Sequence, residues 1–206
     1  MPSPKIAAFR RLHESGCFVI PNPWDRGSAI CLEQLGFKAL ASTSAGFAWS
    51  IGLPDNGVTV DHVVAHLEAI AGAVTVPVNA DFEGGFAAAP EGVAANVTRA
   101  VATGIAGLSI EDSTGDARAP LYDFEVAVER IKAARAAIDA SRTGVLLTAR
   151  TEGFLVGRAD IGETIRRLEA FAAAGADCLY APAIKKKEDI VAVVKAVAPK
   201  PVNLLV

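Results

Sequence analysis

The sequence predicts an α/β protein of the (β/α)8 barrel type, incomplete at its C-terminal end. Short apolar runs alternate with segments of helical period along the whole chain, which is typical of a parallel sheet. The runs are almost continuously apolar, as expected of strands buried on both faces. Polar residues follow several different runs, and a barrel collects its site in that way. An open doubly wound sheet is the alternative, but no Gly-x-Gly-x-x-Gly turn follows the first run.

A leading helix is expected from about Lys5 to Glu14, followed by seven strands. We expect the strands at residues 18–20, 39–42, 76–81, 107–111, 145–150, 178–181 and 201–206. A closed barrel needs eight strands and typically about 250 residues. The 206 residues are therefore expected to form a single barrel domain that stops before strand eight and the C-terminal helices, and the natural protein is expected to continue past Val206.

Helices are expected between the strands. Residues 60–67 place apolar side chains at positions i, i+3, i+4 and i+7, and residues 124–140, 161–174 and 188–198 have a similar period. Pro90 lies where the first turn of a helix accepts proline. Glycine after a periodic segment, as at Gly36, marks the end of a helix.

Composition narrows the possible partners and locations. The formal charge of −3 and the single basic cluster, Lys185 to Lys187, disfavour nucleic-acid binding. No apolar run approaches the length of a membrane span, and the N-terminus lacks the apolar core of a signal peptide. The three scattered cysteines have no metal-ligand spacing and are expected to be buried thiols. We therefore expect a cytoplasmic protein that binds neither nucleic acid nor membrane.

Acidic residues gather at the ends of neighbouring predicted strands. Asp81 and Glu83 end one strand, Glu111 ends the next, and Arg150 follows on the third. Such carboxylates repel one another unless a cation lies among them, and an all-oxygen ligand set selects Mg²⁺, with Mn²⁺ also suitable. Arg150 would offer a planar cation for a substrate carboxylate or phosphonate. Asp55 lies in the segment after the second strand.

The ordered motifs resemble the isocitrate lyase/phosphoenolpyruvate mutase superfamily over roughly residues 5 to 206. The blocks that carry the resemblance are Val19-Ile20-Pro21-Asn22-Pro23-Trp24-Asp25-Arg26-Gly27-Ser28-Ala29, Thr43-Ser44-Ala45-Gly46-Phe47-Ala48, Ile51-Gly52-Leu53-Pro54-Asp55, Ala80-Asp81-Phe82-Glu83-Gly84-Gly85, Ile110-Glu111-Asp112 and Ala149-Arg150-Thr151-Glu152. Each block alone is a weak signal, but the set in this order is specific.

The resemblance implies roles for individual residues. Asp81 resembles the direct Mg²⁺ ligand, and Glu83 and Glu111 resemble ligands that act through water. Ser44, with the backbone of Ala45 and Gly46, resembles a loop that cradles the substrate carboxylate. Asp55 resembles an acid that orients water or takes a proton, and Arg150 resembles the arginine that binds the substrate anion. The aromatic ring of Trp24 is expected either to wall the pocket or to pack in the core.

The expected activity follows from the same resemblance. Family members break or form a bond next to a 2-oxo acid, and many assemble as dimers or tetramers. We therefore expect a Mg²⁺-dependent lyase acting on a small 2-oxo or 2-hydroxy carboxylate, in a homo-oligomer. The Lys-Lys-Cys-Gly-His gating segment of the lyases is absent from the sequence, as is the lysine of the mutases after Glu111-Asp112. A phosphonopyruvate hydrolase or mutase-like enzyme and a catalytically silent ligand-binding relative stay open as alternatives.

Two further features of the sequence are weaker signals. His62 and His66 are four residues apart on a predicted helix, but no acid occupies the HExxH position, so surface histidines are expected. Lys185 to Lys187 are expected to form a solvated charge run before a helix rather than a substrate contact.

Overall fold

A computed structural model describes residues 3–205, in which six parallel strands form one sheet. Each strand pairs with its neighbour in sequence, so the order is β1-β2-β3-β4-β5-β6. The strands are β1 (Leu40–Ala41), β2 (Val78–Asp81), β3 (Gly107–Glu111), β4 (Leu146–Arg150), β5 (Cys178–Tyr180) and β6 (Val202–Asn203). Sequential order with a helix in every connection between the described strands is the arrangement of a (β/α) barrel, here open as a half-barrel, and the predicted fold class is confirmed.

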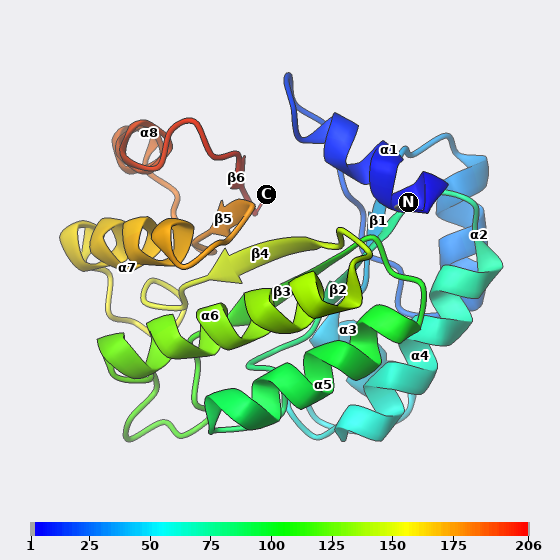
Figure 1. The fold of residues 1–206 in the computed structure, drawn as a ribbon, viewed down its shortest axis with the longest axis horizontal. Helices are drawn as coiled ribbons and strands as arrows, with labels where there is room; N and C mark the ends of the chain where they lie inside the picture. Colours follow the sequence, from blue (N-terminus) through cyan, green and yellow to red (C-terminus); the bar gives the residue numbers. More distant parts are fainter. Residues whose placement is uncertain (1–2, 206) are drawn as a thin grey trace.

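Helices follow one another around the sheet (Figure 1). They are α1 (Pro4–Leu12), α2 (Arg26–Gln34), α3 (Ser44–Ser50), α4 (Val60–Ala73), α5 (Pro90–Ala102), α6 (Phe124–Ser141), α7 (Ile161–Ala173) and α8 (Lys187–Ala196). Local sequence explains several of their starts. Thr59 caps α4 in a capping box, Pro90 opens α5, and the Asp160 side chain accepts from Glu163 N at the start of α7.

The strand predicted at residues 18–20 does not form. Ala41 N donates to Pro21 O at 3.0 Å, so the extended segment lies beside β1 without building a ladder. Pro21 and Pro23 lack the N–H groups that a strand would donate there. The predicted count of seven strands is therefore wrong by one within residues 3–205. The strand predicted at 201–206 is reduced to Val202–Asn203, and Val206 lies outside the described residues.

Helix α1 covers the amino ends of the strands. Phe9 of α1 is 1% exposed, and a Cβ added at Gly107, where β3 begins, would lie 2.6 Å from its ring. Arg10 Nε donates to Gly144 O at 2.7 Å, ahead of β4. Lys5 Nζ donates to the carbonyl oxygens of Ala71 and Val74, which end α4. With the amino ends covered, the carboxyl ends of the strands are the face on which a site can form.

The register aligns the strand ends on that face. Glu111 pairs with Arg150, Arg150 with Tyr180, and Tyr180 with Asn203. Partners in a parallel ladder project their side chains to the same side of the sheet, so these four residues form one row. The row ends β3, β4, β5 and β6, next to Asp81 at the end of β2.

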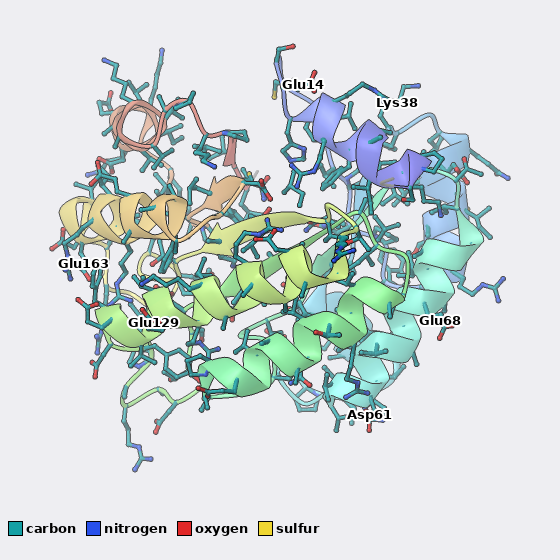
Figure 2. The ribbon with its side chains drawn as sticks, in the orientation of Figure 1. Glu14, Lys38, Asp61, Glu68, Glu129 and Glu163 are labelled. Carbon is teal, nitrogen blue, oxygen red and sulfur yellow. The ribbon has the colours of Figure 1, made fainter. Side chains whose placement is uncertain are left out.

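Other acidic residues lie on the outer faces of the helices. Figure 2 shows Glu68 on α4 and Glu129 on α6 pointing away from the sheet, and both are exposed. Glu129 pairs with Lys132 one turn later, a contact that contributes little in water. Within residues 3–205, no helix combines the length and the apolar character needed to cross a bilayer.

Candidate active site

Arg150, at the end of β4, lies among the carboxylates of three strand ends. Its Nε donates to Glu152 Oε1 and lies 3.5 Å from Glu111 Oε2. Its Nη1 lies 3.7 Å from Asp81 Oδ1. The guanidinium carbon stands 5.1 Å from the centre of the Tyr180 ring, within range of a cation–π contact. Arg150 therefore faces the carboxyl edge of the sheet rather than the outer helices.

Burial and mutual repulsion shift the pKa values of these acids. Burial is the main cause that raises the pKa of Glu83 to about 7, and Asp81 and Asp55 add to it. Burial also raises the pKa of Glu111 to about 8, against the opposing effect of Arg150. Carboxyl groups with such values hold protons near neutral pH unless further positive charge is supplied. One arginine does not balance the acids around it.

Asp81 joins β2 to the start of α3. Its backbone N donates to Ser42 Oγ at 2.9 Å, and its Oδ2 accepts from Ser44 N at 3.0 Å. Its other oxygen, Oδ1, is buried and has no hydrogen-bond partner among the described residues. One oxygen of the Asp81 carboxylate is thus held by a hydrogen bond, whereas the other, within residues 3–205, has only the ion pair with Arg150 at 3.7 Å.

The segment expected to be a substrate-cradling loop is instead the first turn of α3. Ser44, Ala45 and Gly46 follow the cap Thr43, whose Oγ1 accepts from Gly46 N at 3.2 Å. A Cβ added at Gly46 would lie 2.6 Å from Thr43 Cγ2, so no side chain fits there. The same added Cβ would lie 3.4 Å from Trp24 Cβ, which places half-exposed Trp24 beside this turn rather than in the core.

Helix α3 is supported from α4 by an aromatic stack. The rings of Phe47 and His66 lie 3.8 Å apart with an interplanar angle of 17°. His66 Nε2 is buried and has no hydrogen-bond partner within residues 3–205. Burial lowers the pKa of His66 to about 4, although Asp25 acts in the opposite direction. His66 is therefore a packing residue and not the surface histidine that its sequence context predicted, whereas His62 is exposed and completes the cap of α4.

The low pKa of His66 predicts a loss of stability in mild acid. Between pH 6.5 and 4 the unfolded chain binds a proton at this histidine and the folded chain does not, so stability falls as the pH falls through that window. We expect a loss of about 1–2 kcal/mol from this group, reduced by its partial exposure. Urea unfolding at pH 7 and pH 4.5 should show a smaller loss in His66→Gln. The control His62→Gln should keep the loss of the parent, and equal losses in all three proteins would contradict the assignment.

Glu83 and Asp55 complete the acidic side of the site. Glu83 follows β2, and its backbone oxygen accepts from Glu111 N at 3.0 Å. Its Oε1 is buried without a hydrogen-bond partner among the described residues. Asp55 is exposed, and its charge adds to the rise in the pKa of Glu83. The predicted acids Asp81, Glu83 and Glu111 thus lie together at the carboxyl ends of β2 and β3, and Asp55 acts on Glu83 through its charge.

The donor set suits a hard divalent cation bound partly through water. In residues 3–205, no group of three or more Asp, Glu, His or Cys side chains is arranged so that it could hold a metal ion by itself. Arg150 lies 3.5 Å from Glu111 and 3.7 Å from Asp81, so these two carboxylates already face a positive charge. Mg²⁺ usually keeps several waters and needs only one or two direct carboxylates. The oxygens of Asp81 and Glu83 that lack a hydrogen-bond partner among the described residues would suit such an ion.

Three nearby residues were not identified as functional from the sequence. Glu152, 3% exposed, orients Arg150, and Tyr180 supports the guanidinium from β5. Asp112 is buried and accepts from Thr151 Oγ1 at 2.7 Å, Glu152 N at 2.9 Å and Arg167 Nη1 at 3.1 Å. Asp112 therefore locks the ends of β3 and β4 together instead of joining the acids around Arg150. Tyr180 could have been identified from the sequence only through strand pairing, in which Glu111 aligns with Arg150 and Arg150 aligns with Tyr180.

Comparison with known proteins places these features in one family. The family model for phosphoenolpyruvate phosphomutase matches residues 9–206. A Burkholderia cenocepacia protein, assigned provisionally as a lyase or mutase, has a crystal structure that superposes with a TM-score of 0.96 at 47% identity, covering 98% of this chain and 73% of that one. A 2,3-dimethylmalate lyase superposes with a TM-score of 0.87 at 29% identity, covering 97% of this chain and 69% of that one.

Sequence comparison gives the same result. An uncharacterised Mycobacterium tuberculosis protein, Rv1998c, is 31% identical over 96% of this chain and 73% of its own length. The 2-methylisocitrate lyase of Escherichia coli is 33% identical over 76% of this chain, which spans about half (54%) of that enzyme. The fold, the ordered motifs and these matches agree, and the chain belongs to the phosphoenolpyruvate mutase/isocitrate lyase superfamily.

Proposed function

We propose that this protein is a Mg²⁺-dependent lyase that cleaves or forms a carbon–carbon bond next to a 2-oxo acid. The observation that carries the proposal is the excess of buried carboxylates around Arg150, with no hydrogen-bond partner for Asp81 Oδ1 or Glu83 Oε1 within residues 3–205. The substrate would be a small 2-oxo or 2-hydroxy carboxylate. Mn²⁺ would be able to replace Mg²⁺, because both prefer oxygen ligands.

Asp81 would hold the metal ion directly, and Glu83 and Glu111 would hold it through water. When bound, Mg²⁺ supplies the positive charge that stabilises an enolate next to the broken bond. The Asp81 carboxylate is ready for this role because Ser44 N already fixes its second oxygen. The positive charge of the metal would also lower the pKa values of Glu83 and Glu111, so that both would be ionised at neutral pH.

Arg150 would bind the carboxylate of the substrate. Glu152 holds Nε, and Nη1 lies 3.7 Å from Asp81 at the strand ends; the paired donors of a guanidinium suit a carboxylate. The first turn of α3, at Ser44 to Gly46, would receive a second oxygen group of the substrate, and Trp24 would form the adjoining wall. Asp55 is exposed at the rim, where it would exchange a proton with solvent.

Related proteins set the candidates for a substrate test. They include 2-methylisocitrate lyase, 2,3-dimethylmalate lyase and oxaloacetate acetylhydrolase. The protein would be incubated with each corresponding acid and Mg²⁺, and the release of a smaller acid product would be followed by chromatography. We expect release from at least one acid, abolished by EDTA. Equal release in EDTA would contradict the proposal.

A carbon–phosphorus enzyme is the second candidate, favoured by the match to the phosphoenolpyruvate phosphomutase family model. Phosphonopyruvate in the same assay separates the two, because release of inorganic phosphate or formation of phosphoenolpyruvate would identify this activity. Metal binding without turnover of any acid would instead favour a silent relative. Light scattering on the same preparation would test the proposed homo-oligomer.

A further inference from the structure

The turn after β2 is held by side chains from two helices. Five successive carbonyl groups, Gly84 to Ala88, each accept a hydrogen bond from Asn96 of α5 or Arg130 of α6. Asn96 Nδ2 donates to Gly85 O at 3.0 Å and to Phe86 O at 3.3 Å. Arg130 donates to Gly84 O, to Ala87 O and, at 2.6 Å, to Ala88 O. Because side chains bind these carbonyls in succession, the backbone path of the turn is fixed.

The buried side chain of Arg130 has the carbonyl oxygens of this turn as its main partners. The residue is 1% exposed, although arginine almost never lies so deep without a partner. Its guanidinium carbon lies 4.0 Å from the centre of the Tyr122 ring, which fixes the plane of the group. Within residues 3–205 no carboxylate lies within ion-pair distance of Arg130. Backbone oxygens of the turn are therefore its main partners.

The turn carries Glu83 in a conformation that needs outside support. Glu83 has a φ of 46°, in the left-handed region that side chains other than glycine rarely adopt. A Cβ added at the next residue, Gly84, would lie 3.1 Å from Arg130 Nη2 and 3.2 Å from Ser113 O. The backbone at Gly84 is thus pressed between Arg130 and the segment after β3. Such a conformation persists where the surroundings over-determine it.

We propose that Arg130, assisted by Asn96, is the positioning residue of the metal site, which it serves by fixing the turn that aims the Glu83 carboxylate at Asp81. This inference rests on the proposed Mg²⁺ site. Arg130 itself touches neither metal nor substrate. Without it, the turn would relax from the left-handed conformation at Glu83, and the carboxylate would leave its place beside Asp81.

The test is the affinity of the folded protein for Mn²⁺ alone, measured by electron paramagnetic resonance and by calorimetry. We expect Arg130→Met to weaken Mn²⁺ binding at least tenfold. Loss of a positive charge would by itself favour a cation, so weaker binding identifies a geometric effect. Arg130→Lys keeps the positive charge but loses the planar guanidinium and its several N–H donors. We expect it to weaken Mn²⁺ binding several-fold. Asn96→Leu removes two of the five carbonyl contacts without any change in charge, and should also weaken binding several-fold.

Arg135→Met is the matched control. Arg135 lies on the same helix and pairs with Asp139 and Asp177, at the other end of the sheet. Its loss should lower the melting temperature and leave the Mn²⁺ affinity within twofold of the parent. If Arg130→Met does not fold, the Mn²⁺ affinity of Asn96→Leu tests the inference instead.

The outcomes separate the two proposals. A parent protein that binds no Mn²⁺ overturns the proposed function and this inference together. A parent that binds Mn²⁺ while folded Arg130→Met and Asn96→Leu bind it equally well overturns only the inference, because both residues would then serve stability alone.

Discussion

Asp81→Asn is expected to weaken Mg²⁺ binding about 100-fold and to abolish turnover of the acid substrate. The asparagine keeps the size of the side chain and an oxygen for Ser44 N, but it removes the charge on the proposed direct ligand. Glu83→Gln and Glu111→Gln should weaken binding less, because these acids would act through water. Calorimetric titration with Mg²⁺ measures all three variants.

Asp61→Asn is the control for this experiment. Asp61 is an exposed acid of α4 that pairs with Arg99, so its loss changes the net charge of the protein equally. The control should bind Mg²⁺ as the parent does. Equal affinity in Asp81→Asn and Asp61→Asn would remove Asp81 from the metal site.

The second large effect is expected at Arg150. Arg150→Met would leave the buried carboxylates of Glu111 and Glu152 without their cation, at a cost of about 3–5 kcal/mol in unfolding free energy. Arg150→Lys keeps the charge and should be more stable than Arg150→Met. It loses the planar pair of donors, so kcat/KM should fall about 100-fold. Urea unfolding and steady-state kinetics separate the two effects.

Arg99→Met provides the comparison for stability, because the Arg99–Asp61 pair is exposed and contributes less than about 1 kcal/mol. If Arg150→Lys retained the parental kcat/KM within twofold, Arg150 would not bind the substrate anion. If Arg150→Met were as stable as Arg99→Met, the buried carboxylates would not depend on it.

Much of the fold could be predicted because the sequence pattern is local. Short apolar runs predicted six strands that overlap the observed ones, and the period of residues 161–174 matched helix α7. Residues 18–20 have the same apolar character, but Pro21 and Pro23 prevent a ladder. Helix α3 was mistaken for a loop because its small residues, Ser44 to Gly46, have no helical period, and its cap at Thr43 shows only in three dimensions.

The site residues at the strand ends could be predicted, because strand pairing determines their positions. Asp81, Glu111 and Arg150 end adjacent strands, and parallel pairing brings such ends together whatever the rest of the fold. The contacts of Arg130 could not be predicted, because they join residues more than 40 positions apart through a turn of irregular shape. The burial of Asp112 likewise depends on Arg167, on a helix 55 residues away in sequence.

Oxalate binding tests the central claim most directly. Oxalate presents two adjacent carboxyl groups, as a 2-oxo acid presents its carboxylate and oxo oxygens, and it cannot undergo cleavage of a bond to a third carbon. We expect calorimetry to detect oxalate binding to the parent protein with Mg²⁺, and to detect none in EDTA or in Asp81→Asn with Mg²⁺. Oxalate binding of equal strength in EDTA and in Mg²⁺ would contradict a metal-dependent site at the carboxyl ends of these strands.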